Sequence, residues 1–356
     1  MNMMIVNHLN EDDWRRFVYS SPDGNIYHTP EMFEIFSRTR GYQPELWAAL
    51  DEQSEILALM LPVHVTLRNG LLRSLTTRSI VYGGTLAVPG ITGQNALATL
   101  LAVYKKSSGR RPVFTEIRNV SDSTGLQATL NTAGFTYEDH LNYLIRLVPE
   151  PDEVFNRIGH RTQKNIRRGL KKALVEIKEV QDPEDLHDGY DLLRRTYQHA
   201  RVPLADQSLF QSAFELLTPK GMFMATLAKV EGSPAAASFE LLYKDTLTGW
   251  YGGMDRAFSA YVPNELLMWY ILKSGCEKGY RMYDFGGAGK PDEEYGVRDF
   301  KAKFGGDLVN FGRNTWVPHP ALLSLSRLGY KVYRSVLSVG NNKRRKTQDA
   351  PPSATG

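Results

Sequence analysis

Hydrophobic and polar positions along the chain follow two patterns, one with the period of a strand and one with the period of a helix. In the first half, short apolar runs bounded by turn residues predict strands at 45–50, 56–65, 71–75 and 79–82. A run with helical spacing, Asn95–Tyr104, follows, and Val113–Arg118 predicts a closing strand. Antiparallel strands followed by a helix and another strand favour an α+β fold over a doubly wound parallel sheet.

The second half repeats this order. It predicts strands at 222–230, 235–243 and 247–251, a helix at 264–277 and a closing strand at 281–285. Each half carries a Tyr-Gly-Gly triplet, beginning at Tyr82 and at Tyr251, and the spacing from the tyrosine to the closing strand is nearly the same in both. The matched order and spacing predict a duplicated domain, with a boundary near Val148, where two prolines interrupt the chain.

A long helical stretch is predicted to open the second half, with Asp152 as its N-cap. Its expected buried positions are Phe155, Ile158, Ile166 and Leu170. Seven lysines and arginines and no acidic residue lie between Arg157 and Lys172. Two interpretations stay open, a solvated helix face and a surface for a phosphate-rich partner such as a tRNA acceptor end, coenzyme A or a nucleotide-linked sugar.

Composition narrows the class of protein. The chain is 42% hydrophobic and 23% charged, which is typical of a folded globular protein, and its net charge of +4 is too small to indicate a partner. No apolar run approaches the length of a bilayer span, and the N-terminus lacks the pattern of a secretory signal. The single cysteine, Cys276, cannot form an internal disulfide, so we expect a cytoplasmic protein without a transmembrane segment.

Several motifs of known chemistry are missing from the sequence. It contains no HExxH, no paired CxxC and no GxSxG, so we predict no metal site and no covalent intermediate. Gly286–Lys290 resembles a phosphate-binding loop but lacks the GxxxxGK[ST] spacing. We also expect no tightly bound cofactor and no DNA partner.

One region carries a specific resemblance. Tyr283-Asp284-Phe285-Gly286-Gly287 and the segment from Gly296 to Gly306, with Phe300-Lys301 and Phe304-Gly305 inside it, resemble the Fem family of peptidoglycan-bridge aminoacyltransferases. That family belongs to the GNAT acyltransferase superfamily, and its members carry two tandem GNAT-like domains. The resemblance implies a GNAT-like domain at 1–148 and a second at 149–320 with the acyl-transfer cleft. We expect a C-terminal helix at 321–340 and a disordered tail at 341–356, which is basic, polar and Pro-rich.

The resemblance also implies roles for individual residues. Lys301 and Asp284 are the candidate catalytic residues, because acyl transfer to an amine needs stabilisation of the oxyanion that develops on the carbonyl. Candidate residues for binding substrate or carrier are Arg161, Lys164, Arg167, Arg168, Tyr251 and Phe300. The other interpretation of Lys301 and Asp284 is structural, a solvated lysine and a carboxylate that caps a turn.

The donor is the least constrained part of the prediction. Ordinary GNAT enzymes bind the pyrophosphate of acetyl-CoA with a glycine-containing loop, which would be expected after Met254, yet 255–261 contains no glycine. We therefore predict an N-acyltransferase that moves an aminoacyl or acyl group from a carrier ester, with aminoacyl-tRNA favoured, to an amine of a cell-envelope precursor or peptide. The alternatives are an acyl-CoA-dependent enzyme acting on an amino sugar or polysaccharide precursor, and a non-catalytic RNA- or nucleotide-binding protein.

Overall fold

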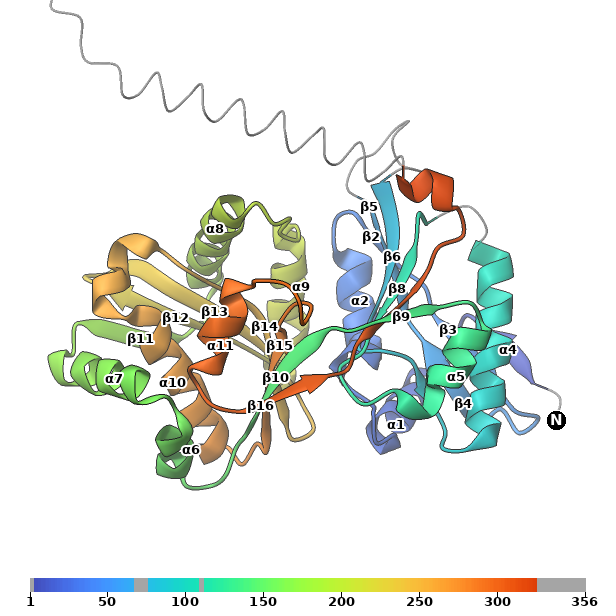
Figure 1. The fold of residues 1–356 in the computed structure, drawn as a ribbon, viewed down its shortest axis with the longest axis horizontal. Coiled ribbons are helices and arrows are strands. Elements are labelled where there is room, and N and C mark those ends of the chain that lie inside the picture. The colour runs from blue at the N-terminus through green and yellow to red at the C-terminus, as the bar shows by residue number, and fades with distance from the viewer. Residues whose placement is uncertain (1–2, 67–75, 109–111, 325–356) are drawn as a thin grey trace, which may run out of the picture.

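Two lobes, each built of helices packed on β-sheet, lie side by side in the computed structural model, which describes residues 3–66, 76–108 and 112–324 (Figure 1). The first lobe holds β1 (Met4–Val6), α1 (Glu11–Ser20), η1 (Ile26–His28), α2 (Pro30–Arg38), β2 (Tyr42–Pro44), β3 (Trp47–Leu50), β4 (Ile56–Met60), β5 (Pro62–Thr66), β6 (Thr77–Tyr82), β7 (Leu86–Ala87), α4 (Ile91–Ser108), β8 (Thr115–Arg118), α5 (Thr124–Thr132) and β9 (Thr136–Glu138). Its strands form one sheet in the order β1-β3-β4-β7 and another that begins β2-β5-β6-β8.

The second lobe is built on a seven-stranded sheet in the order β11-β12-β13-β14-β15-β10-β16. Its elements are β10 (Leu141–Arg146), α6 (Pro151–Arg157), α7 (His160–Lys172), β11 (Val175–Glu179), α8 (Pro183–Ala200), α9 (Gln207–Leu217), η3 (Thr218–Lys220), β12 (Phe223–Val230), β13 (Ser233–Tyr243), β14 (Thr246–Met254), η4 (Arg256–Tyr261), α10 (Pro263–Glu277), β15 (Met282–Gly287), α11 (Gly296–Ala302) and β16 (Asp307–Asn310). This mixed α+β architecture confirms the predicted fold class.

A two-stranded ribbon passes from one lobe to the other (Figure 1). β10 pairs with β15 and β16 in the second lobe, whereas the last strand, β17 (Arg313–Trp316), returns to the first lobe and pairs with β8 and β9. The lobes therefore exchange strands across the predicted boundary near residue 148, because β10 precedes that boundary and β17 follows it.

Each lobe contains one parallel strand pair joined by a crossover helix. β6 and β8 are linked through α4, and β14 and β15 through α10. A parallel pair requires a long connection, and a helix is the usual one. These are the two copies of the unit that the sequence repeat predicts.

A shared core joins the lobes. α2 packs against α9, and the buried side chains of Met32, Ile35 and Phe36 lie in one hydrophobic cluster with Phe210 and Leu217. The lobes are therefore held together by apolar burial and not by the ribbon alone.

Two predicted elements differ from the structure. The single strand expected at 56–65 is two strands in separate sheets, because Pro62 cannot donate to a ladder and restricts the backbone of Leu61. The long helix expected from Asp152 begins at Pro151 and is interrupted at Ile158, which has an extended backbone, and at Gly159, whose N–H bonds the carbonyl of Lys303.

The interruption changes which side chains are buried. In α7 the inward positions are Thr162, Gln163, Ile166 and Gly169, whereas Leu170, which was predicted to be buried, is 56% exposed. The expected strand at 71–75 and the tail at 341–356 lie outside the described residues. So does most of the expected helix at 321–340, of which residues up to 324 are described and helical.

Candidate active site

The parallel strands of the second lobe separate at the position where the predicted site residues begin. β14 pairs with β15 only from Thr246–Met282 to Thr248–Asp284, and then continues to Met254 paired with β13 alone. A β-bulge at Trp250 lies just beyond the last pair, and bulges bend the strand that carries them. Beyond Asp284, the backbone N–H and C=O groups of β14 and β15 therefore do not form hydrogen bonds with each other.

Asp284 lies at this point of divergence. Its side chain is 5% exposed, and its Oδ1 accepts hydrogen bonds from Asn142 Nδ2 at 2.8 Å and from the Gly286 N–H at 2.7 Å. Burial raises the pKa of Asp284, while these two donors and the nearby Lys301 oppose that rise. A carboxylate with a raised pKa is a better proton acceptor than an exposed one.

Lys301 is buried, so it is not the solvated lysine of the structural interpretation. Its Nζ donates to the carbonyl oxygens of Phe285, Gly286 and Gly287 at 2.5, 3.1 and 2.8 Å. These bonds hold the end of β15 against α11 and occupy the three N–H groups of an ammonium. Burial lowers the pKa of Lys301 to about 8, with Asp284 opposing the shift.

Tyrosines from both lobes gather beside Asp284. Tyr251 on β14 lies near Tyr27, Tyr42, Tyr82 and Tyr197. Its burial, and to a smaller extent these four neighbouring hydroxyl groups, raise the pKa of Tyr251 well above the usual value. Tyr27 stacks on Tyr82 with ring centroids 5.9 Å apart, and the Asp284 carboxylate helps to raise the pKa of Tyr27, after burial. The rings of Tyr27, Tyr82 and Tyr251 keep partial solvent exposure.

The sequence analysis missed a group of arginines on the first-lobe sheet beside these tyrosines. Arg118 Nε lies 2.6 Å from Glu116 Oε1, its guanidinium stands 5.5 Å from the centre of the Tyr82 ring, and Arg313 bonds the same Glu116 oxygen at 3.3 Å. Arg78 contributes charge to Glu116 as well. Burial and the charge of Arg118 lower the pKa of Arg313 to about 10.

These side chains could not have been grouped from the sequence alone. Arg78, Glu116, Arg118 and Arg313 come from three strands that are adjacent only in the folded sheet. We call Arg78, Arg118 and Arg313 the junction arginines. With one glutamate among them, they make the region beside the tyrosines electropositive.

The predicted carrier-binding cations lie elsewhere, on α7 at the side of the second lobe away from the first (Figure 1). Arg161, Lys164 and Arg168 are exposed, and within the described part of the chain none of them is within ion-pair distance of a carboxylate. Arg167 instead stands 4.9 Å from the centre of the Phe155 ring. Gly169 of α7 packs against Leu266 near the start of α10, so the basic face runs beside that helix.

The loop that precedes α10 uses its own backbone donors. The Ala257 N–H bonds Asp255 Oδ1, the Phe258 N–H bonds the Asp255 carbonyl, and the Val262 N–H bonds the Ser259 carbonyl. Pro263 has no N–H, and Glu265 places an acid in the first turn of the helix. A pyrophosphate at the start of α10 would therefore find few free N–H donors, and the negative charge of Glu265 would repel it.

The structure thus brings Asp284, Lys301 and Tyr251 into one region and places the α7 cations in another. Phe300 lies in neither, because its ring packs on Phe304 at 5.1 Å, at the edge of the second-lobe core. Within the described residues, no three His, Cys, Asp or Glu side chains are grouped to hold a metal ion. In the same residues, no helix is both long enough and apolar enough to cross a bilayer. The roles of all these residues remain predictions.

Comparison with known proteins agrees with this architecture. Residues 160–301 match the family model described as "Acetyltransferase (GNAT) domain". No curated protein matches the chain. Among solved structures, FemX superposes with a TM-score of 0.68 at 16% identity, over 92% of this chain and 99% of FemX.

Two further structures show the same likeness. The first is a tandem GNAT protein from the clavulanic acid biosynthesis pathway, with a TM-score of 0.55, 12% identity and coverage of 90% of this chain and all of that one. The second is L-PGS from Bacillus licheniformis, with a TM-score of 0.56, 12% identity and coverage of 90% and 96%. At these identities the structures show the fold, while the matched family model supplies the enzyme class. The predicted pair of GNAT-like domains and the acyltransferase class are confirmed.

Proposed function

We propose that this Fem-like member of the GNAT acyltransferase superfamily transfers an aminoacyl group from a tRNA ester to an amine of a cell-envelope precursor or peptide. The reaction takes place where β14 and β15 separate. The amine attacks the ester carbonyl, a C–N bond forms and the C–O bond to the ribose breaks. The proton that the amine gives up ends on the released ribose hydroxyl.

Asp284 is the group that we assign to the proton. Its Oδ1 is engaged by Asn142 and Gly286, which leaves Oδ2 to accept a proton from the attacking amine. The raised pKa of Asp284 suits that task. Lys301 holds the peptide groups of 285–287 in place, and its positive charge favours the ionised form of Asp284.

One observation carries the choice of donor. In the segment where an ordinary GNAT enzyme would bind a pyrophosphate, the backbone N–H groups of Ala257, Phe258 and Val262 bond within the loop, and that of Asp255 bonds the Ala235 carbonyl of β13. Coenzyme A would lose those contacts, each worth about 1.5–3 kcal/mol for a bond to a charged group. An RNA ester does not need them, and the exposed cations of α7 supply the surface that its phosphates require.

The acceptor meets the junction arginines. Arg118 and Arg313 share one carboxylate, Glu116, so the group has charge to spare for an anionic part of the acceptor. The tyrosines beside them offer aromatic faces and hydroxyl donors. These features support an acceptor that carries a phosphate or carboxylate at a distance from its amine.

The donor is tested by titrating the protein with a non-hydrolysable aminoacyl-tRNA and with acetyl-CoA at one salt concentration. We expect the RNA to bind more tightly, with an affinity that falls steeply as salt increases. Micromolar binding of acetyl-CoA together with no measurable RNA binding would reject the proposal in favour of an acyl-CoA-dependent enzyme. RNA binding without turnover on any amine would favour a non-catalytic RNA-binding protein.

A further inference from the structure

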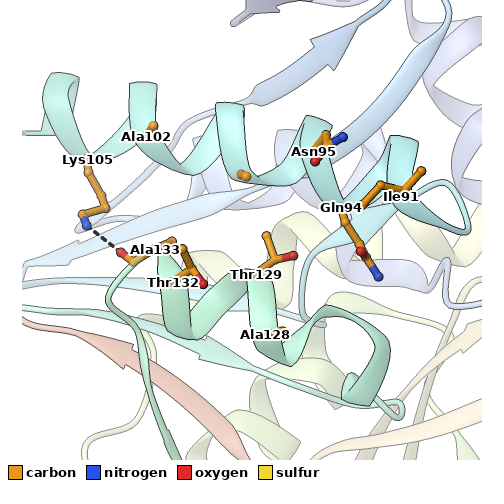
Figure 2. Close-up of a pocket in the computed structure, with 10 residues that line it drawn as sticks. Ile91, Gln94, Asn95, Ala102, Lys105, Ala128, Thr129, Thr132 and Ala133 are labelled. Carbon is orange, nitrogen blue, oxygen red and sulfur yellow. Dashed lines mark hydrogen bonds between the residues drawn. The ribbon is translucent and has the colours of Figure 1, made fainter.

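An open groove runs between α4 and α5 in the first lobe and has a volume of about 510 Å³ (Figure 2). Among the residues that line it, only Lys105 is charged, and its Nζ donates to the Ala133 carbonyl at 2.5 Å. The other lining side chains are alanines, an isoleucine, amides and threonine hydroxyls, which are poor groups for acting on an amine. A partly exposed titratable side chain that the proposed reaction does not use lies elsewhere, at His140.

The backbone of His140 is fixed in the ribbon that passes between the lobes. The residue immediately precedes β10, and its N–H donates to Asn310 Oδ1 at 3.0 Å. Its carbonyl oxygen accepts from the Gly312 N–H at 3.2 Å, in the segment that joins β16 to β17. The position of the imidazole is therefore set by the strands that the two lobes exchange.

The imidazole packs on the end of β15. A Cβ at Gly287 would lie 2.7 Å from His140 Cε1, so the ring fills the space that a side chain at residue 287 would need. The Gly287 carbonyl is one of the three that Lys301 Nζ bonds. Gly287 is also the register partner of Asn142, whose side chain bonds Asp284. The His140 ring thus lies against the same short segment that Asp284 and Lys301 hold.

The hydrogen bond of the ring decides which nitrogen carries the proton. Nδ1 of His140 lies 3.2 Å from the Leu141 carbonyl oxygen, which can only accept, so Nδ1 is the donor. In a neutral imidazole Nε2 then carries the lone pair. Within the part of the chain that the structure describes, Nε2 has no hydrogen-bond partner, and the ring is partly exposed. An acceptor atom is therefore open to a ligand.

The surroundings keep this ring uncharged. Burial lowers the pKa of His140 to about 4, and the charges of Arg313 and Arg118 lower it as well, while the Leu141 carbonyl and Glu116 oppose the shift. The imidazole is accordingly neutral near pH 7. Its Nε2 accepts a hydrogen bond from an N–H but repels the lone pairs of a carbonyl or carboxylate oxygen.

The location of the ring indicates which substrate it meets. His140 lies between the junction arginines, whose charges act on it, and the end of β15, which it contacts. The α7 cations lie at the far side of the second lobe (Figure 1). An acceptor that has its anionic group at the junction arginines and its amine beside Asp284 passes the imidazole between those two points. A peptide presents amide N–H groups there.

We propose that His140 determines specificity for the acceptor, because its Nε2 accepts a hydrogen bond from an amide N–H that lies between the anionic group and the attacking amine. The inference rests on the proposed function for the direction in which the acceptor lies. In this assignment Asp284 takes the proton of the amine and His140 takes none. Gly287 is required as glycine because a side chain would displace the ring.

NMR of the full chain with isotope-labelled histidine tests the contact without RNA and without turnover. The probes are triglycine, which has an amine, amide N–H groups and a carboxylate, and glycyl-sarcosyl-sarcosine, whose amide nitrogens are methylated. The nitrogen resonance of His140 Nε2, assigned by its loss in His140→Gln, should move when triglycine is added and stay in place with the methylated peptide. An unmoved resonance with triglycine overturns the assignment. So does an equal shift with both peptides, or an Nε2 that already carries the proton in the free protein.

Variants separate recognition from a structural role. His140→Leu should weaken triglycine binding by about tenfold, the usual effect of one lost hydrogen bond, and should make the affinities of the two peptides equal. His140→Gln retains an acceptor oxygen and should keep part of the preference for triglycine. The control is His8→Leu, since His8 is exposed in the first lobe. Preserved discrimination in a folded His140→Leu protein overturns the proposal.

Failure of this inference is distinguishable from failure of the proposed function. If Asp284→Asn abolishes turnover while the Nε2 resonance ignores triglycine, only the assignment of His140 is wrong. If Asp284→Asn retains wild-type turnover while the resonance responds to triglycine alone, the proposed mechanism is wrong and the peptide contact stands.

Discussion

The two Tyr-Gly-Gly triplets are identical in sequence and differ in structure. In the first lobe the strand ends at Tyr82, still paired with Arg118, and Gly83 and Gly84 turn away with φ of +81° and +89°. In the second lobe Gly252 and Gly253 remain in β14, which has already left its parallel partner. One duplicated pair of strands is therefore paired to its end, and the other opens.

The surroundings of the triplets explain the difference. In the first lobe, Asn25 Nδ2 bonds the Gly83 carbonyl at 2.9 Å, and the buried His28 ring contacts the Gly84 carbonyl at 3.1 Å, so the N-terminal segment closes the turn. In the second lobe the polar groups gather on the other strand, where Asp284 and the 285–287 peptides are held by Asn142 and Lys301. Duplication supplied the same scaffold twice, and the residues to which we assign the chemistry lie at the copy whose strands separate.

The largest effect is expected from Asp284→Asn. If Asp284 accepts the proton of the attacking amine, turnover should fall by about 10²- to 10⁴-fold, the usual range for a general base. Stability should not fall. Burial raises the pKa of this carboxyl, so the native state favours the protonated acid, and the free energy of unfolding decreases as the pH rises from the ordinary carboxyl range through the raised value.

Since asparagine is neutral at every pH, the variant should be at least as stable as the wild type at pH 7. Steady-state kinetics and thermal unfolding measured on the same preparation check both parts. Arg118 ends the parallel pairing in the first lobe as Asp284 does in the second, and Arg118→Gln should raise the KM for the acceptor more than it lowers kcat. Wild-type turnover in Asp284→Asn would remove Asp284 from the mechanism.

Lys301→Met is expected to lower turnover by about 10²-fold, through loss of the geometry at 285–287. It should also lower the melting temperature, because three buried carbonyl groups lose a charged donor. The wild-type kcat should decline as the pH rises through about 8, where Lys301 loses its charge, and this decline should be absent from the variant. Lys303→Met is the matched control, since Lys303 is exposed two residues further on. A variant with full turnover and a lowered melting temperature would make Lys301 purely structural.

The sequence was sufficient for the architecture but not for the environment of the site. Period-2 and period-3.6 patterns placed the repeated units correctly, because they report local burial. They could not show that Gly159 interrupts the basic helix, which exposes Leu170, since that break depends on a contact with Lys303 far along the chain. For the same reason the junction arginines, which come from three separate strands, carried no signal in the sequence.

A smaller effect is expected on the basic face of α7. Replacing both Lys164 and Arg168 by Gln should weaken RNA binding by about tenfold and reduce the slope of log affinity against log salt by about one for each lost phosphate contact. The control is Arg16→Gln on α1, whose cation already bonds Asp13 at 3.0 Å in the first lobe. An unchanged salt slope in the α7 variant would mean that this face is only solvated.

The smallest effect returns to the two triplets and measures stability alone. At Gly84, with φ of +89°, alanine would sit in a backbone region that residues with a side chain rarely adopt, so Gly84→Ala should lower the free energy of unfolding by about 1–3 kcal/mol. At Gly252 the backbone is extended, and a Cβ would lie 3.7 Å from the Ala237 carbonyl oxygen, an ordinary contact. Gly252→Ala should therefore be neutral or stabilise the fold by up to about 1 kcal/mol, since alanine reduces the freedom of the unfolded chain. Urea unfolding of the two variants decides the matter, and equal destabilisation would mean that both triplets form turns and that the second pair of strands does not open as described here.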